Sequence, residues 1–327
     1  MIDAGLPLVT GLGVLGNGCE NPAMGSCLKE VKDKVEQGAT LAEALADHPK
    51  IFDDLFVNMV AAGESGGILD IILERLAIYL EKADALRREV KTAMIYPGVV
   101  VGAASIVTTI LMLFVIPTFA EMFSDFGAAL PAPTRIVMNM SEFFVSYYHV
   151  MFVLLVGMYW FFKRFSGTSR GQEVLHPIYL KLPVFGEIIR KVAVARFTRT
   201  LGTMLSSGVP IIEALKICAR TAGNKVVEKE VTNVQHSISE GKTIAEPLQD
   251  SMIFPNMVVS MIAVGESTGA LDAMLGKVAD FYEAEVETAV SAMKQLIEPI
   301  MILVLGTLIG GLVVAMYLPI FKLGSVM

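Results

Sequence analysis

The chain is organised around Gly63-Glu64-Ser65-Gly66-Gly67-Ile68-Leu69-Asp70, a stretch that occurs a second time as Gly265-Glu266-Ser267-Thr268-Gly269-Ala270-Leu271-Asp272. The offset from position 63 to position 265 is 202 residues. Chance rarely aligns five blocks in one order, so we interpret the repeat as a duplicated domain. The other matched blocks are Tyr96-Pro97 with Glu298-Pro299, Ile116-Pro117 with Leu318-Pro319, Gly5-Leu6-Pro7-Leu8 with Gly208-Val209-Pro210-Ile211, and Gly38-Ala39-Thr40-Leu41-Ala42-Glu43 with Gly241-Lys242-Thr243-Ile244-Ala245-Glu246.

The two earliest blocks are related by an offset of 203, so one residue is lost near His48 to Ile51. Met1 then aligns with Met204, which lies inside an expected helix at 194–206. The first copy has no counterpart to the lead-in of that helix. We therefore expect the first helix of the first copy to be shortened or missing, because either the start was misassigned or an N-terminal segment is absent.

The composition is typical of a membrane protein. Hydrophobic residues make up 54% of the chain, charged residues only 18%, and the mean hydropathy is +0.61. Soluble chains carry about 25% charged residues. Residues 98–116, 143–162 and 300–318 contain no Asp, Glu, Lys or Arg. Each is close to the length of about 20 residues that a membrane-spanning helix requires.

Basic residues near the spans predict the orientation of the chain, because Lys and Arg are enriched in cytoplasmic segments. Arg87, Arg88 and Lys91 precede the first span, and Lys163 and Arg164 follow the second. We predict two cytoplasmic helical domains at 1–96 (N-terminally truncated) and 163–298, transmembrane helices at 97–117, 143–162 and 299–319, a periplasmic loop at 118–142 and a periplasmic tail at 320–327.

Helical signals predict an all-α fold. Apolar residues follow helical spacing, and Thr40 with Glu43 forms a capping-box pattern that Thr243 and Glu246 repeat. Neither copy contains convincing strand alternation. We expect two homologous cytoplasmic helical bundles of about six helices each, anchored by three transmembrane helices.

The repeated turn motif is the first candidate site. Its glycines would allow a tight reversal between two helices, and the carboxylates of Glu64 and Glu266 would suit the positive end of the following helix. A metal-binding role for these carboxylates is the alternative. Capping is preferred because it explains both copies without a ligand. The motif residues are Gly63, Glu64, Ser65, Gly67, Asp70, Gly265, Glu266, Ser267, Gly269 and Asp272.

Four prolines mark the predicted membrane boundaries. Pro97 and Pro299 stand where each long helix enters the bilayer, and we expect a kink at each. Pro117 and Pro319 stand where the spans leave it.

A basic stripe, defined as Arg190, Lys191, Arg196 and Arg199, is the candidate partner contact. A solvated face and a contact with anionic lipid are the alternatives, and charge patterning alone does not separate the three.

No catalytic or cofactor-binding pattern is evident. Gly241-Lys242-Thr243 resembles the end of a phosphate-binding loop, but His236 occupies the position that needs glycine, so a helix cap is preferred. No Ser-His-Asp set or His-Cys cluster occurs, and the three cysteines have no metal-binding spacing. The net charge of −7 gives no indication of nucleic-acid binding. We expect a scaffold with no enzymatic activity, cofactor or metal.

The chain resembles the type II secretion F family over nearly its whole length, and most of all the pilus branch of that family. The resemblance rests on the order, spacing and topology of Gly63-Glu64-Ser65, Tyr96-Pro97, Pro117-Thr118-Phe119, Gly265-Glu266-Ser267, Glu298-Pro299 and Pro319-Ile320-Phe321, and on the loop 126–134. Members usually have a further N-terminal region that this chain lacks.

The resemblance implies an inner-membrane platform protein of type IV pilus biogenesis. Its implied partners are cytoplasmic assembly and retraction ATPases, pilin subunits, other inner-membrane pilus assembly proteins, membrane lipid and further copies of itself. The platform of a type II secretion pseudopilus is the alternative within the family. A small-solute transporter is disfavoured because the spans are uncharged and the repeat is parallel.

Overall fold

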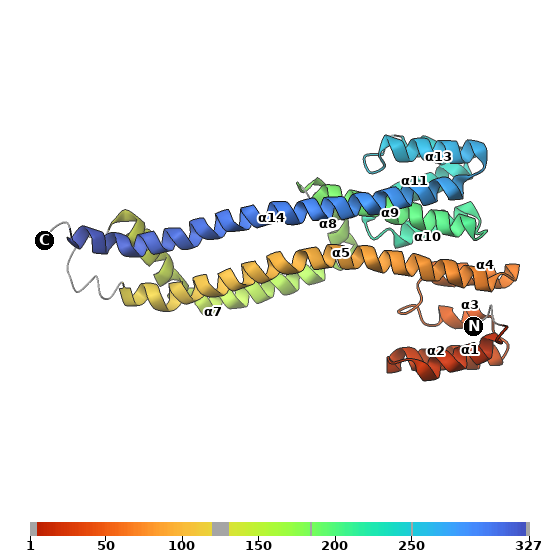
Figure 1. Ribbon diagram of the computed structural model, residues 1–327, viewed down its shortest axis with the longest axis horizontal. Helices are drawn as coiled ribbons and strands as arrows, with labels where there is room; N and C mark the ends of the chain where they lie inside the picture. Colours follow the sequence, from red (N-terminus) through yellow and green to blue (C-terminus); the bar gives the residue numbers. More distant parts are fainter. Residues whose placement is uncertain (1–4, 120–130, 184, 250, 325–327) are drawn as a thin grey trace. The chain divides into compact units, whose positions relative to one another are not determined.

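The computed structural model describes residues 5–119, 131–183, 185–249 and 251–324, and every regular element in that part of the chain is a helix (Figure 1). The all-α prediction is therefore confirmed. The first copy contains α1 (Leu8–Gly18), α2 (Pro22–Glu36), α3 (Leu41–Ala46), α4 (Asp54–Gly66), α5 (Leu69–Ile110) and a π-helical turn, η1 (Leu111–Val115). There follow α7 (Ala132–Ser166), α8 (Ser169–Lys181), α9 (Phe185–Ser206), α10 (Ile211–Thr221), α11 (Lys225–Ser239), α12 (Ala245–Leu248), α13 (Asn256–Thr268) and α14 (Leu271–Gly324).

The duplication is visible in the order of the helices. Helices α1 to α5 correspond one by one to α10 to α14 at the offsets found in the sequence. Helix α9 precedes the second set, and among residues 5–119 no helix corresponds to it. Met1, which aligns with Met204 of α9, lies outside the described residues.

The structure divides into two compact units. Residues 1–87 and 173–287 form one unit, and residues 88–172 and 288–327 form the other. The first unit contains the helical regions of both copies, and they contribute to one hydrophobic core. Tyr79 of α5 and Thr200 of α9 share a buried hydrogen bond of 3.2 Å between their hydroxyl groups. The two copies therefore share a core within this unit instead of burying separate ones.

The second unit carries the apolar segments. Among the residues that the structure describes, three helical stretches are long and apolar enough to cross a membrane, at Leu69–Phe119, Ala132–Ser166 and Leu271–Pro319. Their apolar side chains are exposed, as lipid-facing residues are, including Val99, Ile106, Phe152, Val153 and Leu303. Together with the composition, these helices make the chain a helical membrane protein.

Helix α7 is longer than the sequence predicted. It begins at Ala132, so the last part of the predicted loop 118–142 is helical, and residues 120–130 of that loop lie outside the described residues. Two buried hydroxyl groups of α7 donate hydrogen bonds to the other spans. Thr134 Oγ1 donates to the carbonyl of Ala315 in α14 at 2.6 Å, and Ser141 Oγ donates to the carbonyl of Met112 in η1 at 2.5 Å.

The four candidate prolines lie inside helical segments. Pro97 is within α5, Pro299 and Pro319 are within α14, and Pro117 lies in the helical turn after η1. The long helices therefore continue past these residues. Their role as membrane-boundary markers stays a prediction.

Candidate functional site: the repeated turn and its clasp

The reversal between α4 and α5 is made by Gly67 and Ile68, and Gly67 carries the left-handed turn. Its φ of 65° is left-handed, and the equivalent Gly269 has a φ of 71°. The amide of Ile68 donates to the carbonyl of Gly63 at 2.9 Å, a bond that closes the end of α4 as a glycine cap does. The prediction that the whole motif separates two helices was wrong, because Gly63 to Gly66 form the last turn of α4.

Gly63 serves close packing and does not provide a left-handed turn. A Cβ atom at this position would lie 2.7 Å from Cγ1 of Ile72 in α5. At the equivalent Gly265, a Cβ atom would lie 2.8 Å from Cα of Leu271. The two helices of each pair can therefore approach only because this residue lacks a side chain.

The carboxylates of Glu64 and Glu266 do cap helices, but not the helices predicted from the sequence. Oε1 and Oε2 of Glu64 accept hydrogen bonds from the backbone amides of Leu41 (2.8 Å) and Ala42 (3.2 Å) at the start of α3. In the second copy, Glu266 accepts from Ile244 (2.5 Å) and Ala245 (3.1 Å) at α12. The prediction that these glutamates cap the helices that follow the motif, α5 and α14, was wrong. Each glutamate instead caps the short helix that precedes its own helix, and we call this pair of hydrogen bonds the clasp.

This clasp completes the capping of α3. Thr40 Oγ1 accepts from the amide of Glu43, and the side chain of Glu43 accepts from the amide of Thr40, so the predicted capping box is confirmed. With Glu64 bound to Leu41 and Ala42, the first amides of α3 all have acceptors. Helix α3 has only six residues, and the first four amides of any helix have no acceptor within that helix. Most amides of so short a helix therefore need acceptors from outside it.

The same geometry explains the segment that resembled a phosphate-binding loop. Thr243 Oγ1 accepts from the amide of Glu246 at 3.3 Å, and Glu266 takes the amides of Ile244 and Ala245. A phosphate would need these amides free. The segment therefore caps a helix, as the preferred interpretation of the sequence stated.

The remaining motif residues act locally. Ser65 Oγ donates to the carbonyl of Ala62, and Ser267 Oγ donates to that of Val264. Asp70 and Asp272 lie in the first turns of α5 and α14, where a negative charge is favourable. Within the described residues, no group of three His, Cys, Asp or Glu side chains is placed to hold a metal ion.

The four members of the basic stripe do not form one solvent-facing surface. Arg190 and Arg196 are exposed. Lys191 pairs with Glu187 (2.9 Å) and Glu285 (3.0 Å). Arg199 is mostly buried and is also engaged in ion pairs, so only the two exposed arginines are available to a partner.

Arg199 belongs to an ion-pair cluster that we define as Arg199, Asp280, Glu283 and Lys82. Its guanidinium makes two parallel bonds of 2.8 Å to the Glu283 carboxylate and one of 2.5 Å to Asp280, and Lys82 of the first copy lies 2.7 Å from Asp280. Burial would raise the pKa of Asp280, but the hydrogen bonds and charges of Lys82 and Arg199 outweigh burial and lower that pKa. The cluster therefore links α5, α9 and α14, a role that charge counting along the sequence could not assign.

These features define a class of protein, a helical membrane protein built from two tandem copies of one helical domain with matching clasps. The sequence model described as "Type II secretion system (T2SS), protein F" matches residues 1–117 and 197–319, which are the two copies. The chain belongs to this family.

Relatives within the family have two kinds of name. "Type IV pilus assembly protein PilC" of Myxococcus xanthus is 50% identical over 99% of this chain and 78% of its own length. The protein of that name from Pseudomonas aeruginosa is 42% identical over 100% of this chain and 87% of its own length. "Type II secretion system protein F" of Aeromonas hydrophila is 34% identical over 99% of this chain and 84% of its own length.

Proposed function

We propose that the protein is the inner-membrane platform of type IV pilus biogenesis, where it couples cytoplasmic ATPases to the assembly and disassembly of pilin. The observation that carries the proposal is the identity of 38–50% to pilus assembly proteins, against 31–34% to secretion proteins F, over nearly the whole chain. The platform of a type II secretion pseudopilus is the second candidate, favoured by the family match alone.

Deletion of the gene in its own organism tests this proposal. We expect surface pili to disappear while pilin remains in the membrane, and type II secretion to continue. The wild-type gene supplied in trans should restore the pili. Normal pili together with a secretion defect would support the second candidate and contradict the first.

The energy for pilus assembly arrives, in this proposal, through a bound partner. The described residues contain no phosphate-binding loop, since the amides of the segment that resembled one are taken by Glu266 and Thr243. The helical unit of residues 1–87 and 173–287 is the surface we assign to the partner. Helices α5 and α14 begin in this unit and continue into the apolar one, so a displacement at their first turns would reach the spans.

The exposed arginines Arg190 and Arg196 are our candidate contact for the ATPase. Reversal of both charges, Arg190→Glu with Arg196→Glu, should weaken co-purification with the ATPase and reduce piliation, while leaving the amount of membrane-inserted protein unchanged. Surface charges act mainly on the encounter rate, so the defect should vary with ionic strength. The matched control is Lys181→Glu with Lys229→Glu, which makes the same charge change at two other exposed positions. Full piliation in the arginine variant would remove these residues as the contact.

The orientation that we propose places residues 1–96 and 163–298 in the cytoplasm. Single cysteines can test it after the native cysteines are replaced. Ser169→Cys at the start of α8 should resist a membrane-impermeant thiol reagent added outside the inner membrane. Ser124→Cys and Ser325→Cys, at positions outside the described residues, should react with it. The reverse pattern would invert the topology.

A further inference from the structure

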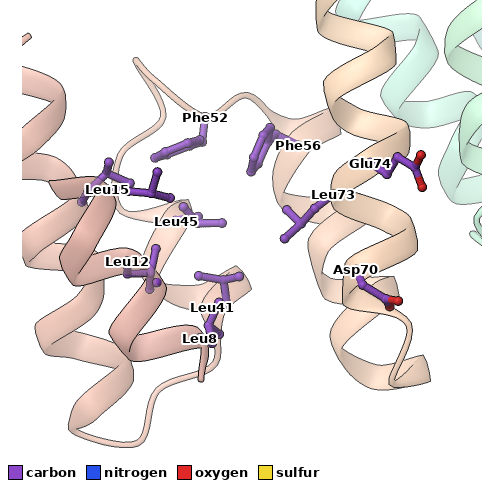
Figure 2. A pocket seen from close by; sticks show the side chains of 12 residues that line it. Leu8, Leu12, Leu15, Leu41, Leu45, Phe52, Phe56, Asp70, Leu73 and Glu74 are labelled. Carbon is purple, nitrogen blue, oxygen red and sulfur yellow. The ribbon is translucent and has the colours of Figure 1, made fainter. Parts of the chain in front are cut away.

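A polar cavity between α5 and α14 differs in its chemistry from the apolar cavity of the first copy. The apolar one is lined mainly by leucines, and Figure 2 shows Leu73 pointing toward them while the carboxylates of Asp70 and Glu74 point away. The polar one has a volume of about 260 Å³ and lies within the second compact unit. We call it the proline pocket, and its lining residues are Thr92, Ala93, Tyr96, Pro97, Lys294, Gln295 and Glu298.

The proline pocket lies where both long helices reach their uncharged runs. Pro97 stands directly before the run at 98–116, and Glu298 is the last charged residue before the run at 300–318. Exposed apolar side chains follow the pocket on both helices, such as Val99 on α5. Polar and charged groups beside an apolar span lie at the membrane–water interface. We therefore expect the pocket at the depth of the lipid headgroups.

The polar side chains of the pocket are not used by the chain itself. Among the residues that the structure describes, none forms a hydrogen bond or ion pair with the side chain of Thr92, Tyr96, Lys294, Gln295 or Glu298. The pocket therefore offers one free positive charge and one free negative charge. Its volume is several times the roughly 30 Å³ that a water molecule takes in the liquid, so it has room for a group that carries both charges.

Pro97 and Pro299 leave two backbone carbonyls of this pocket without their helical donors. Proline has no amide hydrogen, so the carbonyl four residues earlier in the helix loses its hydrogen bond. Those carbonyls belong to Ala93 and Gln295, and both residues line the pocket. Ala93 is only 2% exposed, and buried carbonyls almost always have a donor. The occupant of the pocket should therefore supply N–H or O–H groups.

The prolines at the other end of the spans show how this chain treats such carbonyls. Pro319 leaves the carbonyl of Ala315 without a helical donor, and Thr134 Oγ1 donates to it at 2.6 Å. The proline after η1 cannot donate five residues back in the π-helical register, and Ser141 Oγ donates to that carbonyl, which belongs to Met112. Within the described part of the chain, no side chain does the same for the two carbonyls of the proline pocket.

We propose that the proline pocket binds the headgroup of a phospholipid that carries both a phosphate and a primary ammonium group, as phosphatidylethanolamine does. Lys294 pairs with the phosphate. The lipid ammonium has three N–H donors, which match the Glu298 carboxylate and the carbonyls of Ala93 and Gln295. The acyl chains continue along the exposed apolar side chains of the spans. The inference does not rest on the role in pilus assembly.

The chemistry of the pocket separates this headgroup from two common alternatives. A choline headgroup has the same charges but no N–H, so it cannot donate to the two carbonyls. Proteins hold quaternary ammonium groups in aromatic cages, and Tyr96 is the only aromatic residue among the described residues that line the pocket. A glycerol headgroup has hydroxyl donors but no positive charge for Glu298.

Lipid titration with the full-length protein in detergent tests the proposal. Phosphatidylethanolamine, phosphatidylcholine and phosphatidylglycerol with identical acyl chains are the probes, and native mass spectrometry counts the bound lipids. We expect one phosphatidylethanolamine to bind saturably and about tenfold or more tightly than either of the other lipids, because only its headgroup meets both charges and both carbonyls. Equal affinities for the three lipids, or a preference for phosphatidylglycerol, would overturn the proposal.

Charge variants locate the lipid in the pocket. Glu298→Gln should weaken phosphatidylethanolamine binding about tenfold and remove its advantage over phosphatidylcholine, since the partner of the ammonium is lost. Lys294→Gln should weaken the binding of both lipids, since both carry the phosphate. The matched controls are Glu287→Gln and Lys91→Gln, at exposed positions of the same two helices that do not line the pocket. If the pocket variants and the controls bind alike, the lipid does not bind there.

A proline variant tests the freed carbonyl without changing any charge. Pro97→Ala returns a helical donor to the carbonyl of Ala93, so phosphatidylethanolamine binding should weaken about threefold or more while the helix becomes more stable. The control is Pro319→Ala, because the carbonyl of Ala315 already has Thr134 as its donor. Lipid selectivity that is the same in both variants would contradict the role of the freed carbonyl in binding.

Discussion

At the residue scale, the glutamate of the repeated motif joins two helices that the sequence keeps apart. Glu64 lies in the last turn of α4 yet satisfies two amides of α3, and Glu266 does the same for α12. That a carboxylate in this motif caps a helix could be predicted from its charge. Which helix it caps could not, because the contact depends on the angle at which α3 packs against α4.

Glu64→Gln tests the clasp. An amide side chain offers one acceptor oxygen, and its NH₂ group would face the second backbone amide, so we expect a loss of about 1–2 kcal/mol of unfolding free energy. Thermal unfolding in detergent measures the loss, and Glu266→Gln should give a similar one. If Glu64→Gln abolishes function while the unfolding temperature stays the same, the residue contacts a ligand or partner and capping is not its main role.

Gly67→Ala should destabilise the protein by about 1 kcal/mol or more, because its φ of 65° is costly for any residue with a Cβ atom. Gly66→Ala is the matched control. Its Cβ atom would meet the nearest side-chain atom at an ordinary 3.5 Å, so this change should be neutral or slightly stabilising. Equal effects on the unfolding temperature would show that the left-handed turn is not the constraint.

At the element scale, α9 is the helix on which the arrangement of the first unit depends. It covers the second copy, shares the buried hydrogen bond with Tyr79 of α5 and supplies Arg199 to the ion-pair cluster. The sequence indicated a helix here, but only from Val194, and it suggested a solvent-facing basic stripe. Spacing alone could not distinguish Arg199 from Arg196, because their difference lies in the acidic residues of α14 that only Arg199 meets.

A double-mutant cycle between Arg199 and Glu283 tests the cluster. Two parallel charge-assisted bonds between mostly buried side chains should give a coupling energy of about 1–2 kcal/mol. The exposed pair Lys216 and Glu213, 3.3 Å apart on one helix, is the control and should give about 0.5 kcal/mol or less. If both cycles give the same coupling energy in unfolding measurements, the cluster stabilises the protein no more than an exposed ion pair does.

At the scale of the whole molecule, the sequence predicted the helical class, the three spans and the duplication, because apolar length and repeated blocks are properties of the chain itself. The two cytoplasmic domains at 1–96 and 163–298 stay a prediction, and both helical regions contribute to one core. Contacts between the copies, such as Tyr79 with Thr200, join residues that no local pattern connects.

The stability of the whole protein should fall through His176 as the pH drops from about 6.5 to about 5. Its Nδ1 accepts from the amide of Lys225 at 2.8 Å, which requires a neutral ring, and burial together with the Lys225 charge lowers the pKa of His176 below its ordinary 6.5, against the opposing charge of Glu228. The unfolded chain therefore binds a proton at His176 more readily than the folded chain does. The contribution of His176 to the free energy of unfolding is full above about pH 6.5 and is lost as the pH falls. His176→Gln retains an acceptor without a titrating group, so unfolding temperatures measured across this range should drop less for that variant than for the wild type.

The π-helical turn at Leu111–Val115 makes the two duplicated spans differ in geometry. Ile116 donates to the carbonyl of Leu111, five residues back, whereas the equivalent stretch of α14 keeps its α-helical form. One residue more per turn rotates everything beyond it by about 100°. Pro117 and Pro319 therefore stand at equal distances along their copies but point in different directions around the helix axis. The two spans arose by duplication, but their final turns now present different faces. Each span can therefore contact a different neighbour.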